Sequence, residues 1–219
     1  MWTLKLCREA AAGESGPMVT QLLQDWARSI ARKVAQVFVR TPISPNMLTL
    51  FGFVLNAIVA GILASGHLIT GGLVLIFAAL FDMLDGALAK ITNRITLFGG
   101  FLDSVVDRYS EAVVLLGLLL FYYWRPGNSS VTEVILIYVI LVGSVMISYA
   151  RARAEALGIH NEVGLMARPE RIVLLAIGLV FHTWLLDLVL WVLAIGTQIT
   201  AIQRIVHVWL VTSGKRENK

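Results

Sequence analysis

Residues 70–122 read TGGLVLIFAALFDMLDGALAKITNRITLFGGFLDSVVDRYSEAVVLLGLLLFY. The segment consists of two long apolar stretches, 70–90 and 96–122, joined at the short polar turn Thr92-Asn93. Each stretch reaches the roughly 20 residues with which an α-helix crosses the hydrocarbon core of a bilayer. The segment therefore predicts a hairpin of two membrane-spanning helices.

Four further apolar stretches of similar length flank this hairpin. They lie at roughly 47–65, 131–153, 170–187 and 188–210. Turn residues separate most of them, but the break expected near Asp187 carries no Gly or Pro. The pattern predicts an all-α, polytopic membrane protein with six transmembrane helices.

The composition of the chain agrees with this class. Hydrophobic residues make up 58% of the 219 residues and charged residues only 15%, with a mean hydropathy of +0.78. Soluble domains carry about a quarter charged residues, which solvate their surface. The composition therefore excludes an ordinary soluble globule, and no basic stripe with aromatic residues indicates nucleic-acid binding.

The segment before the first apolar stretch has two parts. Residues 1–20 contain no long apolar run with a cleavage site and are interpreted as a flexible tail without a removable signal peptide. Residues 21–40 place apolar side chains at helical spacing between basic ones, which predicts an amphipathic helix on the membrane surface. Residues 41–212 then form the six-helix domain, and 213–219 a C-terminal tail.

The basic residues predict the orientation of the chain in the membrane. Lysines and arginines precede the first stretch, follow the second, surround the turn between the fourth and fifth, and close the chain. The loops of the opposite side offer only Arg125. By the positive-inside rule, a multi-pass protein of the cell membrane with both termini in the cytoplasm is expected.

Four aspartates lie within the apolar hairpin, where hydrocarbon excludes charge. Asp82 and Asp85 are spaced i, i+3, and Asp103 and Asp107 are spaced i, i+4, so each pair shares one helix face. One unpaired carboxylate at mid-membrane costs about 2.5 kcal/mol or more. Two Mg²⁺ ions, or Mn²⁺, would neutralise all four, and carboxylate oxygens suit such hard cations. Paired metal ions are a recurring solution for phosphoryl displacement.

The hairpin also resembles the signature of a known enzyme family. Asp82, Asp85, Gly86, Ala89, Lys90, Gly99, Asp103 and Asp107 match the pattern D-x2-D-G-x2-A-R-x8-G-x3-D-x3-D of the CDP-alcohol phosphotransferases at every spacing. One position departs, because Lys90 stands where the family usually has Arg. The positive charge is kept, but planar bidentate recognition of phosphate is lost.

The resemblance implies a homodimer of six-span subunits with an active site that faces the cytoplasm. Asp82, Asp85 and Asp103 would be metal ligands, and Asp107 both a ligand and the catalytic base. The residues that would contact the CDP-lipid are Pro45, Asn46, Thr49, Asp82, Gly86, Lys90 and Thr96. For Pro45 and Asn46 an ordinary helix start, with Asn46 as its cap, is an equal alternative, and Thr96 is alternatively a plain loop threonine.

The acceptor alcohol is suggested by basic residues near three helix ends. The stretches around Arg151, Arg171 and Arg204 resemble those of phosphatidylinositol phosphate synthases and their archaeal counterparts, where such residues bind the phosphate of the acceptor. Arg204 lies among apolar residues, so it needs an anion, a helix carbonyl, an ion pair or a path to the interface. Arg151 and Arg171 are alternatively positive-inside anchors of the membrane.

Three nearby charges receive simpler interpretations. Arg153 and Arg168 are expected to pair with Glu155, Glu170 or lipid headgroups. Glu111, one turn beyond Asp107, is expected to form a local ion pair, although it could orient a ligand.

The preferred reaction is transfer of a phosphatidyl or archaetidyl group from CDP-diacylglycerol or CDP-archaeol to inositol 1-phosphate, with release of CMP. Glycerol 3-phosphate, or another alcohol, is the alternative acceptor. A polyprenyl transferase and a divalent-ion transporter are rival classes. The transporter would explain the carboxylates but leaves the glycines, Lys90 and the arginines without a role.

Overall fold

The structure is a computed structural model that describes residues 44–91, 96–124, 131–181 and 183–214, with backbone only at residues 45, 83–91, 183 and 214. The predicted tail at 1–20 and the predicted amphipathic helix at 21–40 lie outside these residues, as do residues 215–219 of the C-terminal tail. Within the described ranges the chain is helical, and its only other structure is turns and short connections.

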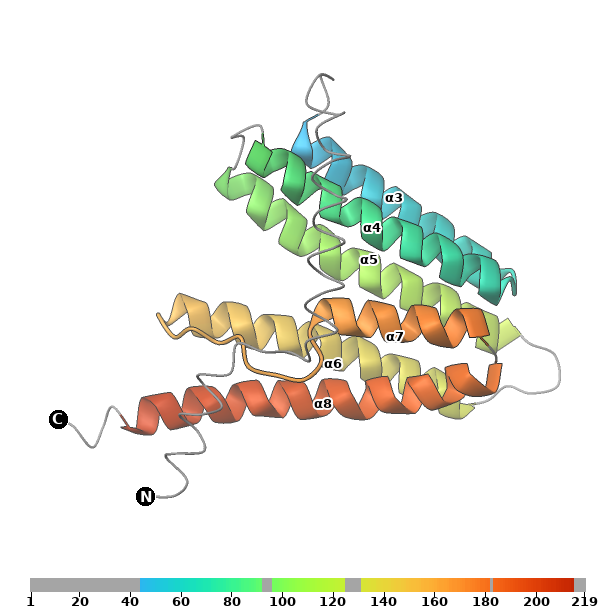
Figure 1. Ribbon diagram of the computed structural model, residues 1–219. Helices are drawn as coiled ribbons and strands as arrows, with labels where there is room; N and C mark the ends of the chain where they lie inside the picture. The colour runs from blue at the N-terminus through green and yellow to red at the C-terminus, as the bar shows by residue number, and fades with distance from the viewer. Residues whose placement is uncertain (1–43, 92–95, 125–130, 182, 215–219) are drawn as a thin grey trace.

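The described residues form six helices (Figure 1). They are α3 (Pro45–Ala64), α4 (Leu68–Ile91), α5 (Leu97–Trp124), α6 (Val131–Ala156), α7 (Arg168–Phe181) and α8 (Thr183–Gly214). The predicted stretches coincide with α3 to α6 to within a few residues. The break expected near Asp187 was misplaced, because α7 ends at Phe181 and Asp187 lies inside α8. Its carboxylate accepts a hydrogen bond of 2.8 Å from the Tyr122 hydroxyl, so the charge is satisfied without a turn.

Three of the described helices are long and apolar enough to cross a membrane. They comprise Asn46–Ala64, Val131–Ala156 and Trp184–Ser213, while Leu68–Asp82 is a shorter apolar helix. Helix α5 carries several charges in its first half, and α7 has only 14 residues. The structure thus establishes several apolar helices, and six membrane crossings remain a prediction.

The helices form two groups that meet along their inner faces (Figure 1). Helix α3 packs against α4 and α5, and α8 packs against α6 and α7. Contacts of α4 with α7, and of α5 with α6, join the two groups. Fully buried leucines and isoleucines, among them Leu63, Leu118, Ile137 and Leu190, fill the space between them. The first residue of α7 is thereby brought beside the charged parts of α4 and α5.

Glycines allow the closest helix contacts. A Cβ on Gly117 of α5 would collide with backbone atoms of Ala60 in α3. A Cβ on Gly143 of α6 would likewise collide with the side chain of Thr197 in α8. Small residues at these crossings let helix backbones approach, as is common in membrane helix packing.

The outer faces of the helices are strongly apolar. Large side chains such as Phe51, Leu73, Ile135 and Trp191 are each more than half exposed. Monomeric soluble proteins rarely expose contiguous apolar surface on this scale. The exposed apolar side chains, together with the composition of the chain, are those of a membrane protein.

Candidate active site

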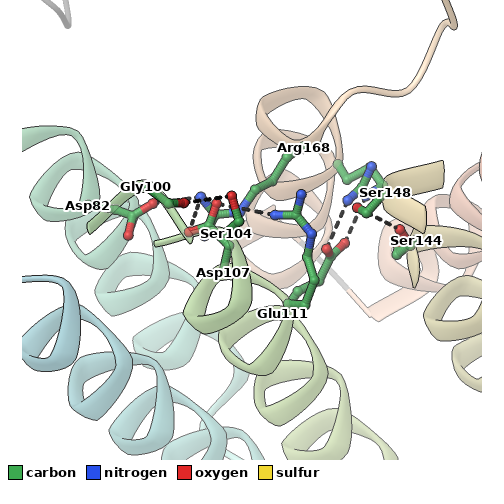
Figure 2. Close-up of polar contacts among 10 residues, drawn as sticks. Asp82, Gly100, Ser104, Asp107, Glu111, Ser144, Ser148 and Arg168 are labelled. Carbon is green, nitrogen blue, oxygen red and sulfur yellow. Dashed lines mark hydrogen bonds and ion pairs between the residues drawn. The ribbon is translucent and has the colours of Figure 1, made fainter. Parts of the chain in front are cut away.

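Two carboxylates from neighbouring helices converge on one arginine (Figure 2). The Nη1 atom of Arg168, the first residue of α7, lies 2.6 Å from Asp82 Oδ2 and 2.9 Å from Asp107 Oδ1. Asp82 comes from α4 and Asp107 from α5. The three side chains are only 13–23% exposed, so little water screens their charges.

The other two aspartates of the signature are placed less completely. Asp103 is half-buried and lies one turn before Asp107 on the same face of α5. Asp85 lies in α4, but only its backbone is described. Among the side chains that the structure describes, no three Asp, Glu, His or Cys residues are grouped closely enough to hold a metal ion.

The described part of the cluster nevertheless suits a bound cation. Its donors are carboxylate oxygens, which hard divalent ions prefer. Asp107 Oδ1 is buried and makes no hydrogen bond to any described residue, although it contacts the charge of Arg168 at 2.9 Å. The Arg168 guanidinium stands between the two carboxylates as a positive group. The carboxylates of Asp82 and Asp107 thus already bind one positive group, the guanidinium of Arg168, and their charge and oxygen atoms suit the expected divalent metal ion.

A second buried ion pair lies one turn away on both helices. Arg171 of α7 donates to Glu111 of α5 through Nε at 2.7 Å and through Nη2 at 2.8 Å. Its Nη1 donates to the carbonyl of Met166 at 3.0 Å. The expected local ion pair of Glu111 was wrong, because Arg108 contacts Asp107 instead, at 3.3 Å.

The remaining predicted acceptor arginines bind protein groups. Arg151 contacts Glu155 at 2.8 Å and Glu162 at 2.6 Å near the surface. Arg204 is buried and donates to the carbonyls of Val163 at 3.0 Å and Ile147 at 2.7 Å. Of the alternatives for Arg204, the structure therefore shows the bond to backbone, which ties α6 and the loop after it to α8.

These three arginines still share one neighbourhood. The positive charges of Arg151 and Arg171 both act on Arg204. A phosphate in this region would thus meet cations from α6, α7 and α8, each now held by a carboxylate or a carbonyl.

A small cavity of about 30 Å³, partly open to solvent, adjoins the two ion pairs. Its polar lining comprises Asn56, Ser110, Glu111, Arg168 and Arg171, and apolar side chains form the rest.

The expected donor residues lie at the starts of α3 and α5. Ser44, rather than Asn46, caps α3, since its hydroxyl accepts a hydrogen bond of 3.3 Å from the Met47 amide. Thr96 caps α5 by accepting a bond of 2.9 Å from the Gly99 amide. A Cβ on Gly99 would lie 2.9 Å from Thr96 Oγ1 and 3.1 Å from Asn46 Oδ1. Gly99 therefore lets the side chains of Thr96 and Asn46, at the starts of the two helices, lie close to its backbone.

The other expected donor residues are described less fully. Thr49 is buried in α3. Pro45 stands in the first turn of α3, and Gly86 and Lys90 lie in α4, but their side chains are outside the described residues.

Arg168 is the residue of this site that the sequence interpretation missed. It was expected to pair with nearby glutamates or lipid, whereas its partners lie 86 and 61 positions away in the sequence. One signal was available, because Arg168 and Arg171 are spaced i, i+3 and share a helix face. Two arginines on one face of a membrane helix are stable only with compensating groups, so they predict carboxylates on the helices that this face contacts.

Comparison with known proteins identifies the family of the chain. The family profile described as CDP-alcohol phosphatidyltransferase matches residues 42–210. A phosphatidylinositol phosphate synthase of Mycobacteroides abscessus is 35% identical over 182 residues, which cover 80% of this chain and 81% of that protein. An archaetidylinositol phosphate synthase of Methanothermobacter thermautotrophicus is 35% identical over 192 residues, or 86% of this chain and 94% of that protein.

The fold is shared with a solved relative. The crystal structure of the Mycobacterium tuberculosis phosphatidylinositol phosphate synthase with CDP-DAG bound superposes with a TM-score of 0.77 at 34% identity, over 83% of this chain and 94% of that one. The same enzyme in complex with manganese and citrate gives a TM-score of 0.76 at 34% identity, over 82% of this chain and 88% of that one.

Proposed function

The chain belongs to the CDP-alcohol phosphatidyltransferase family of membrane enzymes, and from that premise we propose that it transfers the phosphatidyl or archaetidyl group of a CDP-lipid to inositol 1-phosphate and releases CMP. The observation that carries this proposal is the convergence of Asp82 and Asp107, from neighbouring helices, on a single cationic nitrogen. The names of the relatives support the choice of acceptor.

The four aspartates carry the chemistry. Asp82, Asp85, Asp103 and Asp107 hold two divalent ions, Mg²⁺ or Mn²⁺, which would supply charge neutralisation for the diphosphate of the donor. The manganese complex of the mycobacterial relative supports the use of a divalent ion. The resemblance to the family assigns Asp107 the role of catalytic base, and its carboxylate lies beside Arg168 of α7 within the carboxylate cluster.

The transfer is a displacement at phosphorus. Asp107 accepts the proton of the attacking hydroxyl group of the acceptor, and the resulting alkoxide forms a bond to the lipid-side phosphorus. The bond from this phosphorus to the bridging oxygen breaks, and CMP leaves with the electron pair. Burial of the carboxylates keeps bulk water from competing with the acceptor.

The donor nucleotide lies against the starts of α3 and α5. The side chains of Asn46 and Thr96 lie close together beside Gly99, and Pro45, Thr49, Gly86 and Lys90 complete the donor site. The mycobacterial relative with CDP-DAG bound supports a CDP-lipid donor.

The acceptor phosphate binds where Arg151, Arg171 and Arg204 gather. Arg151 is the most exposed of the three and can exchange Glu155 or Glu162 for phosphate at the lowest desolvation cost. Glycerol 3-phosphate carries the same charge, so the inositol ring must be distinguished by hydrogen bonds between its hydroxyl groups and polar side chains of the protein.

The proposal includes the assembly and the topology of the protein. Homodimerisation, six membrane crossings and a cytoplasmic active site follow the family and the distribution of basic residues. The exposed apolar faces of the helices support burial in lipid and in a subunit interface.

An acceptor screen tests the proposed function. Purified protein in detergent is given CDP-lipid, Mg²⁺ and one of inositol 1-phosphate, glycerol 3-phosphate or free inositol, and released CMP is measured. We expect release with inositol 1-phosphate and at least about tenfold less with the others, as when one charged hydrogen bond or several neutral ones are lost. Release with none of the three acceptors would refute a transferase of this kind.

A further inference from the structure

Arg168 occupies the place between two carboxylates that the proposed function assigns to metal ions. A single atom, Nη1, contacts Asp82 of α4 at 2.6 Å and Asp107 of α5 at 2.9 Å. We propose that Arg168 is the resident counter-cation of the metal-free cluster and that an incoming divalent ion displaces it. The inference rests on the proposed function for the assignment of these carboxylates to metal ions.

Displacement follows from the position of the two charges. A divalent ion at this site would be held by the carboxylate oxygens of Asp82 and Asp107, which are the ligands that hard cations prefer. The guanidinium holds one oxygen of each carboxylate at hydrogen-bonding distance. A metal ion and a guanidinium that share these ligands would repel each other at short range in a poorly screened site. The two cations therefore compete.

Arg168 is also the less firmly held of two arginines that lie one turn apart. Arg171 donates from all three of its nitrogens, to Glu111 and to the Met166 carbonyl. Arg168, by contrast, has a buried Nε with no hydrogen-bond partner among the described residues. A guanidinium in its final binding site normally satisfies its buried donors. Arg171 thus anchors α7, while Arg168 is free to exchange partners.

The consequence is a link between metal binding and the first turn of α7. In the metal-free protein Arg168 joins α7 to α4 and α5 and neutralises part of the carboxylate charge. When the metal site fills, this tie is released and the guanidinium of Arg168 becomes available to an anion. The apparent metal affinity equals the intrinsic affinity multiplied by the fraction of metal-free protein in which Arg168 has released the carboxylates.

Manganese binding to the metal-free, full-length protein tests the inference. Mn²⁺ is titrated into detergent-solubilised protein without CDP-lipid, and free Mn²⁺ is followed by electron paramagnetic resonance. Arg168→Gln is expected to bind Mn²⁺ about tenfold or more tightly than the wild type, as the loss of one charge-assisted competing interaction implies. Asp82→Asn removes a proposed ligand and is expected to weaken Mn²⁺ binding, which would show that the measured Mn²⁺ binds at the aspartate cluster.

A matched control separates competition from a general charge effect. Arg153→Gln removes the same charge from an exposed position on α6 and is expected to leave the Mn²⁺ affinity within about twofold, since exposed distant charges are screened. Equal or weaker Mn²⁺ binding by Arg168→Gln would overturn the inference. An equal gain in Arg153→Gln would do the same.

Thermal melting tests the inference if Arg168→Gln is difficult to purify in folded form without metal. Without metal, Arg168→Gln is expected to melt below the wild type, and saturating Mn²⁺ is expected to close the gap. Recovery of folded variant only with Mn²⁺ present supports displacement, whereas loss of the fold in both conditions shows a purely structural role and overturns it. The Mn²⁺ titration contains no substrate, so an unchanged Mn²⁺ affinity of Arg168→Gln refutes only the role of Arg168 as a counter-cation. Absence of CMP release in the acceptor screen refutes only the proposed function.

Discussion

The buried pair Glu111–Arg171 offers the sharpest test of how this structure is held together. Nε and Nη2, along one edge of the planar Arg171 guanidinium, donate to the two carboxylate oxygens of Glu111 at 2.7 and 2.8 Å. The Arg171 side chain is 4% exposed and that of Glu111 is 12% exposed. Replacing Glu111 with Gln leaves a buried guanidinium without its counter-charge.

The expected loss follows from this burial. Removing one partner of a buried ion pair costs about 3–5 kcal/mol, because the remaining charge stays desolvated. For a chain of this length, each kcal/mol shifts the melting temperature by about 2–4 °C. Glu111→Gln should therefore lower the melting temperature in detergent by roughly 6–20 °C. Arg171→Met should do the same, and the double variant should lose less than the two single losses together.

The exposed arginine pair provides the control for this measurement. Arg151 contacts Glu155 at 2.8 Å, but the side chains are 43% and 46% exposed. Such pairs contribute about 0–1 kcal/mol, so Glu155→Gln should shift the melting temperature by less than about 4 °C. Additive losses in the Glu111 and Arg171 variants, or a loss no larger than in the control, would refute the bidentate buried pair.

Three further predictions concern catalysis, packing and topology. Asp107→Asn should keep the fold and lower CMP release by at least about 100-fold, since a general base contributes 10²–10⁴-fold; undiminished turnover would remove Asp107 from the mechanism. Gly117→Ala should destabilise the protein by about 1–3 kcal/mol, seen as a lower melting temperature, because its methyl group meets the Ala60 backbone. The single cysteine, Cys7, should react with an impermeant maleimide in inverted but not in right-side-out vesicles, and the opposite labelling would contradict a cytoplasmic N-terminus.

Some helix boundaries of this chain are predicted by neighbouring residues in the sequence, and one is not. The starts of α3 and α5 are encoded by short polar residues, since Ser44 and Thr96 each cap the helix that follows. The end of α7 carries no such signal, and the sequence interpretation placed it at the next charged residue, Asp187. A charged residue predicts a break only if no partner is within reach, and Tyr122 of α5 supplies one.

The partners of the charged residues show where local signals stop. The spacing of the four aspartates predicted which of them share a helix face, and their convergence was expected if the two helices faced each other. In the structure α4 and α5 are not packed directly against each other, and Asp82 and Asp107 converge on Arg168 of α7 instead. The spacing of Arg168 and Arg171 predicted a shared helix face but not what that face contacts. Only the packing of α7 against α4, and its approach to α5, assigned these arginines to carboxylates 60 to 86 positions away.

Sequence alone thus determined the class of protein, the approximate helices and the family, since each depends on hydropathy, capping and spacing over short distances along the chain. Tertiary structure decided which arginine neutralises which carboxylate. Electrostatic pairing depends on distance in space, and in a helical bundle that distance is set by the crossing of helices far apart in the sequence. Arg168 acquired its place between Asp82 and Asp107 in this way.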